Sequence, residues 1–188
     1  MKLMITIVIS MTMILSSSCE LIPITFDEVC EEGMRYKFYP NSTLEWEQAR
    51  DFCESEDGFL ATVNYRGLHK RLRKYINANP GLGEPYGNGY WIGLSDRMIE
   101  DVFMWTDLTE LTYHEGWSEE RIGRKTVVQP NNNVKQNCNG QDCIQMWHNP
   151  AIDGKLTLWA FDDDTCDVNK GFICQYTSGC EGVTAAPL

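Results

Sequence analysis

Residues 90–94, Tyr90-Trp91-Ile92-Gly93-Leu94, carry the strongest fold signal in this sequence of 188 residues. They form a short apolar run that lies among Gly, Asp, Asn and Thr residues. Short apolar runs bounded by turn residues are typical of buried strands. A second such run, Val102-Phe103-Met104-Trp105, follows a polar turn. The region after Gly81 is therefore predicted to consist of strands joined by long loops.

Before this segment the sequence predicts a first helix over Leu44–Ser55. Thr43 offers a capping hydroxyl at its start, and Gly58 ends it. The run 59–63 behind this helix favours a short strand. The apolar residues of the helix recur at helical spacing on one side: Trp46, Ala49, Phe52 and Cys53.

A second helix is expected over Asn64–Asn77, with Pro80 beyond its end. Its apolar face consists of Leu68, Leu72, Tyr75 and Ile76. Its basic residues are Arg66, Lys70, Arg71, Arg73 and Lys74. This basic run has two interpretations. It is either an ordinary solvated helix face or a site for sulfated or sialylated glycans or anionic membrane.

The rest of the chain completes a single domain. Residues 118–142 are polar and predict a long functional loop, while 143–147 and 171–176 predict closing strands. With 43% hydrophobic and 23% charged residues, the chain can bury a real core. Two helices followed by strands indicate an α+β fold. The expected domain spans residues 30–176, and 177–188 form a C-terminal tail.

The N-terminus has the features of a secretory signal over residues 1–18. Lys2 precedes an uncharged apolar run, and small residues (16–18) end it. A membrane span needs about 20 apolar residues, so this run is too short, and we expect no transmembrane segment elsewhere. The protein is predicted to be secreted and extracellular. An N-glycosylation sequon at Asn41 agrees with this.

Secretion favours disulfides for the cysteines after Cys19. The signal could be cleaved before or after Cys19, so whether the mature chain keeps Cys19 is open. Zinc is the competing use, but no CxxC pair or HExxH spacing supports it. The cysteines after Cys19 are odd in number, which predicts a free thiol or a bridge to a second chain. They are Cys30, Cys53, Cys138, Cys143, Cys166, Cys174 and Cys180.

Charge and missing motifs exclude several classes of function. The formal net charge of -11 disfavours nucleic-acid binding and favours a divalent cation. No GxSxG, P-loop or metalloprotease helix is present, so we expect no enzyme.

These strings, in this order, resemble the C-type lectin-like domain family over about residues 30–176. The resemblance implies an α+β fold of two helices packed on small antiparallel sheets, with a long polar loop and disulfide staples. The matching strings are Trp46–Cys53, Leu60–Val63, Trp91–Leu94, Phe103–Asp107, Tyr113–Trp117, Asp142–Ile144, Cys166 and Phe172–Cys174.

The resemblance implies the bridges Cys53–Cys174 and Cys143–Cys166, each worth about 3–5 kcal/mol on a chain-entropy estimate. Chain ends lie close together in this fold, which makes Cys30–Cys180 a third candidate. Cys138 then has two alternatives. It forms an intermolecular bridge in a disulfide-linked oligomer, or it pairs with a retained Cys19.

Sugar-binding members of the family use one calcium ion, which takes about six to eight oxygen ligands. Two of its ligands flank a cis proline, a third precedes an Asp-Cys pair, and the last two precede a strand cysteine. By this resemblance the ligands that hold calcium and contact the sugar are Gln129, Asn131, Gln141, Asp162 and Asp163.

The sequence departs from the family pattern in ways that weaken the site. Gln141 stands where Glu is usual, Asp162 where Asn is usual, and Phe161 where Trp is usual. The segment from Trp117 to Gln129 is also longer than is usual. Two carboxylates instead of three predict a weak calcium site.

The resemblance thus predicts a secreted calcium-dependent lectin that binds glycans or glycoproteins. Gln129 resembles the galactose-type tripeptide and Asn131 the mannose-type one, so the preferred terminal sugar stays open. The alternative is a calcium-independent domain that binds a protein partner, as a toxin or inhibitor subunit does.

Overall fold

A computed structural model describes residues 27–122, 125–134, 140–148 and 159–180. The predicted secretory signal (1–18), Cys19 and Cys138 lie outside the described residues, as do the last eight residues of the expected tail. None of the helices in the described ranges is long and apolar enough to cross a membrane.

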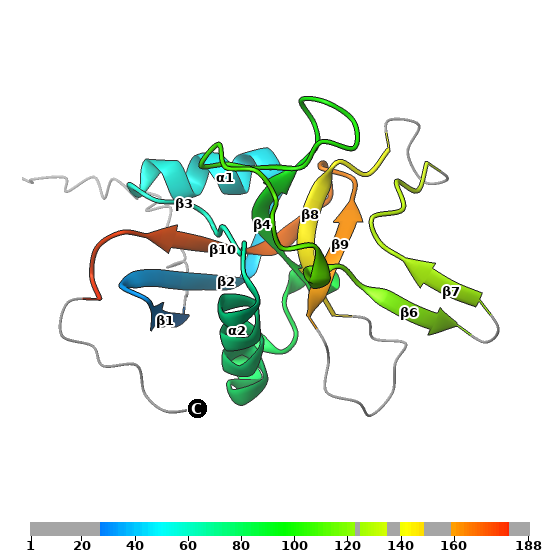
Figure 1. Cartoon of the computed structure of the whole chain (residues 1–188). Coiled ribbons are helices and arrows are strands. Elements are labelled where there is room, and N and C mark those ends of the chain that lie inside the picture. Colours follow the sequence, from blue (N-terminus) through cyan, green and yellow to red (C-terminus); the bar gives the residue numbers. More distant parts are fainter. Residues whose placement is uncertain (1–26, 123–124, 135–139, 149–158, 181–188) are drawn as a thin grey trace, which may run out of the picture.

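Most strands join one sheet that changes direction between its two halves. In Figure 1, β1, β2 and β10 run across the view, while β4, β8 and β9 run nearly upright. The pair β10–β4 is parallel, and the other pairs in the sheet are antiparallel. The order across the sheet is β1 (Asp27–Glu31), β2 (Met34–Leu44), β10 (Lys170–Tyr176), β4 (Gly89–Ser95), β8 (Cys143–Trp147) and β9 (Ala160–Asp164), with β3 (Phe59–Leu60) on β10 and β5 (Met104–Trp105) on β4.

Strand β4 confirms the strand predicted over 90–94 and lies between two hydrophobic cores. Because side chains alternate along a strand, Ile92 and Leu94 enter one core and Trp91 the other. All three are fully buried. A Cβ at Gly93 would lie 2.7 Å from the carbonyl oxygen of Leu60, so this close approach of backbones requires glycine.

The two predicted helices are present, α1 (Trp46–Ser55) and α2 (Arg66–Ala78). Each contributes to a different core, α1 through Trp46, Ala49 and Cys53 and α2 through Leu68, Leu72 and Ile76. The start of α1 differs from the prediction. Glu45, not Thr43, is its N-cap, because Glu45 and Gln48 form a reciprocal capping box. Three short 3₁₀ turns lie between the main elements: η1 (Pro80–Leu82), η2 (Tyr86–Asn88) and η3 (His114–Gly116).

The structure forms all three expected disulfides. Cys53–Cys174 ties α1 to β10, and Cys143–Cys166 ties β8 to the turn after β9. Cys30–Cys180 joins β1 to the segment after β10, which brings the two ends of the domain together.

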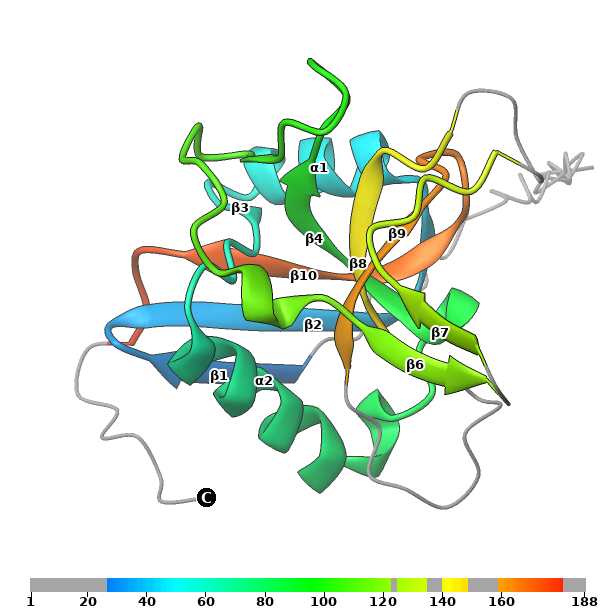
Figure 2. The ribbon, with the colours of Figure 1, turned by 45° about the vertical axis from the view of Figure 1, so that its right-hand side comes forward.

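The polar region 118–142 holds a hairpin that the sequence did not predict, formed by β6 (Glu119–Ile122) and β7 (Lys125–Val128). Figure 2 shows the hairpin extending from the side of the molecule that carries β8 and β9. Gln129 follows β7 directly, and its N–H donates to the carbonyl of Ser118 (2.9 Å). The hairpin therefore delivers the chain to the start of the candidate site.

Candidate functional site

The tripeptide Gln129-Pro130-Asn131 opens the candidate site. The Gln129–Pro130 peptide bond is cis, as the family resemblance implied. The amide of Asn131 donates from Nδ2 to Oε1 of Gln129, so the two side chains lie on the same side of the loop. Two amide groups, each with a donor and an acceptor, thus stand together at an exposed edge.

Asp163 on β9 anchors this loop. The N–H of Asn131 donates to both carboxylate oxygens of Asp163 (3.0 Å each), and the N–H of Asn132 donates to Oδ2 (2.6 Å). Asp163 is only 1% exposed. Burial raises the pKa of its carboxyl group, and the two backbone N–H groups partly offset that rise. In the described part of the chain Asp163 has no ion pair.

Gln141 holds the other side of the loop. Its Oε1 accepts the N–H of Asn133 (2.7 Å), and its own N–H donates to Oδ1 of Asn132 (2.8 Å). Asp163 on β9 and Gln141, just before β8, therefore fix the same loop from two sides. The structure thus brings together four of the five predicted ligands: Gln129, Asn131, Gln141 and Asp163.

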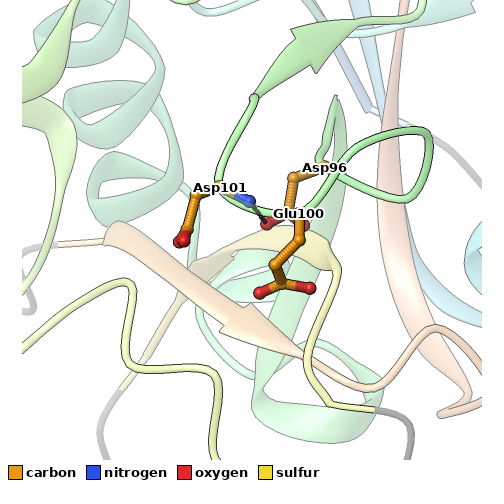
Figure 3. Close-up of side chains that lie close together, drawn as sticks. All are labelled: Asp96, Glu100 and Asp101. Carbon is orange, nitrogen blue, oxygen red and sulfur yellow. Dashed lines mark hydrogen bonds between the residues drawn. The ribbon is translucent and has the colours of Figure 1, made fainter.

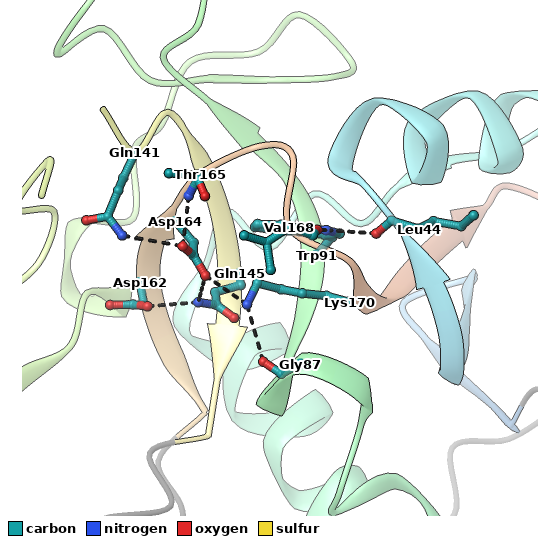
Figure 4. A network of polar contacts seen from close by, with 10 residues as sticks. All are labelled: Leu44, Gly87, Trp91, Gln141, Gln145, Asp162, Asp164, Thr165, Val168 and Lys170. Atoms are coloured by element: carbon teal, nitrogen blue, oxygen red, sulfur yellow. Dashed lines mark hydrogen bonds and ion pairs between the residues drawn. The ribbon is translucent and has the colours of Figure 1, made fainter. Parts of the chain in front are cut away.

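Asp162 takes part in a neighbouring network, which Figure 4 shows. Nε2 of Gln145 on β8 donates to Asp162 (2.9 Å) and to Asp164 (3.4 Å), and Lys170 pairs with Asp164 (2.8 Å). Gln141 closes the connection through Nε2, 3.5 Å from Oδ1 of Asp164. Through Gln145 and Asp164, this network connects Asp162 to Gln141.

The charge of Asp162 is poorly compensated. Burial raises the pKa of its carboxyl to about 7, and repulsion from Asp163 and Asp164 adds to the rise. Gln145 and Lys170 pull in the opposite direction. An added cation would relieve the repulsion between these adjacent acids.

A second acidic group, which the sequence analysis missed, lies in the loop after β4 (Figure 3). Carboxylate oxygens of Asp96, Glu100 and Asp101 lie within 4.8 Å of one another. Asp96 is buried, and its pKa is raised to about 6 by burial and by repulsion from Glu100 and Asp142. Acids placed directly after a buried strand were the signal that could have revealed this group.

The two groups share one pocket of ≈ 170 Å³. Nδ2 of Asn132 donates to Oε1 of Glu100, which links the loop 129–133 to the second group. The N–H of Asp96 donates to the carbonyl of Asp142 (3.2 Å). The pocket is lined by Asp96, Asp101, Phe103, Pro130, Asn131, Asn132, Gln141 and Asp163.

This arrangement fits a divalent cation that prefers oxygen ligands. The donor set consists of carboxylates and amide carbonyls, which suit calcium. Oδ1 of Asp96 and Oδ1 of Asp142 are buried and lack a hydrogen-bond partner among the described residues. Buried acceptors without donors are costly unless something else satisfies them. A cation in the shared pocket would satisfy Oδ1 of Asp96, which lines it.

Comparison with known proteins identifies the family of the fold. Human chondrolectin is 24% identical over 155 residues, which are 76% of this chain and 51% of chondrolectin. This chain therefore spans about half the length of that relative. The C-type lectin mosGCTL-7 of Aedes aegypti is 24% identical over 136 residues, 72% of this chain and 79% of that protein.

Among solved structures, the carbohydrate-recognition domain of the mouse scavenger receptor C-type lectin superposes with a TM-score of 0.58 at 22% identity, over 85% of this chain and 97% of that one. The family model described as Lectin C-type domain matches residues 42–176. The chain therefore belongs to the C-type lectin domain family.

Proposed function

We propose that this protein is a calcium-dependent lectin that binds a terminal sugar of the galactose or mannose type. The observation that carries the proposal is the loop 129–133, which Asp163 and Gln141 hold beside buried acids that repel one another. The residues that would hold calcium are Gln129, Asn131, Gln141, Asp162 and Asp163.

When bound, calcium supplies coordination positions that two adjacent sugar hydroxyls can occupy. The chain contributes the hydrogen bonds around those positions. An amide such as that of Gln129 or Asn131 can direct its oxygen to the cation and its NH₂ group to a sugar hydroxyl. The carboxylates can accept hydrogen bonds from sugar hydroxyls and carry the negative charge that a cation requires.

The proposal describes a secreted binding protein and no catalyst. Residues 1–18 serve as the secretory signal, residues 30–176 form the domain, and residues 177–188 form the tail. Asn41 on β2 is exposed, which suits a glycosylated position. Weak single sites gain affinity when several are linked, and a disulfide-linked oligomer through Cys138 would provide such a link.

A glycan array tests the proposal. The secreted protein is applied in millimolar calcium, and the measurement is repeated with EDTA. We expect signal on galactose- or mannose-terminated glycans that EDTA removes, because the sugar is held through the cation. The preferred glycans then identify the sugar class. A folded protein that gives no signal in calcium would support the protein-binding alternative instead.

A further inference from the structure

One face of α2 lines a hollow of ≈ 800 Å³ that is separate from the calcium site. Its basic residues are Arg66, Lys70, Arg73 and Lys74, which recur at helical spacing. Tyr113 and Asn77 complete the polar lining. Four cations therefore converge on one concave surface of a chain whose formal net charge is -11.

None of these four cations has an acidic partner among the residues that the structure describes. Arg71, the fifth basic residue of the helix, points elsewhere and pairs with Glu31 (3.1 Å). The four are therefore available to an external anion.

The spacing of these basic residues does not stabilise α2. Lys70 lies four residues from both Arg66 and Lys74, and like charges at that spacing destabilise a helix. Arg66 also places a cation at the N-terminus of α2, where the helix dipole is unfavourable to it. An anion bound beside these residues would offset the repulsion among them.

Arg73 adds a donor that points to the same conclusion. Its guanidinium is half-buried, and its Nε has no hydrogen-bond partner among the described residues. Burial lowers the pKa of this group, so an anion beside it would be stabilising. The planar guanidinium can hold two oxygens of one oxyanion at once.

We propose that this hollow binds the sulfate groups of a sulfated polysaccharide. Sulfates spaced along a glycan can meet cations spaced along a helix. A lipid surface fits less well, because membrane-binding helices present apolar residues beside their basic ones. The apolar side chains Leu68, Leu72 and Ile76 of α2 are all buried in the core. Tyr65, at the N-cap, is exposed.

The hollow and the calcium site lie apart. Figures 1 and 2 both show α2 at one end of the molecule, with the loop that follows β4 at the opposite end. Binding of a sulfated glycan at α2 therefore requires no calcium. This independence separates the proposal from the lectin activity proposed above.

The test is binding to immobilised heparin, in EDTA and at physiological salt. The double variant Lys70→Gln/Lys74→Gln should bind about tenfold more weakly than the unchanged protein, the loss expected for two surface charge contacts. The control Arg50→Gln/Arg97→Gln also removes two positive charges, but near α1, where both residues pair with exposed acids. It should bind heparin as tightly as the unchanged protein does. Thermal melting confirms that both variants fold.

Dextran sulfate should compete with heparin, whereas dextran, which lacks sulfate, should not. Equal binding of both double variants, or no binding of the unchanged protein, would overturn the proposal. Binding that requires calcium would assign heparin to the other site and also overturn it. Vesicles containing phosphatidylserine should not bind. Retention by such vesicles without heparin binding would point to a membrane surface instead.

Discussion

Replacement of Asp163 by Ala is expected to abolish the proposed calcium-dependent glycan binding. Asp163 is one of two carboxylates among the proposed ligands, and both of its oxygens accept backbone N–H groups of the loop 129–133. The substitution therefore removes a charge from the cation and releases the loop that carries two other ligands. Since calcium affinity depends strongly on ligand charge, we expect a loss of about two orders of magnitude or more.

The control for this variant is Asp167→Ala. Asp167 is exposed, lies in the turn after β9, and carries the same charge. Its replacement should leave the glycan array signal unchanged. Equal signals from both variants in calcium would show that the sugar is bound elsewhere. Equal melting temperatures of the two variants in EDTA would establish that the difference comes from binding.

Replacement of Trp91 by Ala is expected to remove a large share of the stability of the domain. Trp91 is fully buried on β4, and its Nε1 lies 3.2 Å from the carbonyl oxygens of both Leu44 and Val168. The change leaves a large cavity and frees those two carbonyls. Truncation of a buried Trp costs about 3–5 kcal/mol, compared with about 5–15 kcal/mol for the stability of a whole domain.

Urea denaturation with the disulfides intact measures this loss. Tyr86→Ala is the matched control because Tyr86 is 52% exposed in a turn before β4. Its free energy of unfolding should change by no more than about 0.5 kcal/mol. A similarly small change for Trp91→Ala would mean that the two cores do not depend on β4 as described.

The features that the sequence predicted are those that local patterns encode. The apolar run at 90–94 forms β4, and the helical spacing of Leu68, Leu72 and Ile76 identifies α2. The parallel pairing of β10 with β4 was not predicted, because it joins residues about 80 positions apart, such as Phe172 and Trp91. The hairpin β6–β7 was missed because residues 118–142 contain few apolar side chains.

The same contrast holds for the candidate site, where local sequence strings named some residues and other contacts form only on folding. The proposed ligands, including Gln141 and Asp163, were named from the family resemblance, and their role as ligands stays a prediction. The acids of the group around Asp96 follow β4 directly in the sequence, but only folding brings them against Asn132 and Asp142. Contacts between loops that are distant in the sequence leave no local pattern to read.

Calorimetric titration of the folded protein with calcium at neutral pH tests whether this site holds the cation. The charge count of the ligands predicts saturable binding with a dissociation constant of about 10⁻⁴–10⁻³ M. The heat of binding should disappear in the Asp163→Ala variant. No saturable heat in the unchanged protein, or the same heat in the variant, would contradict a calcium-bridged sugar site at Asp163.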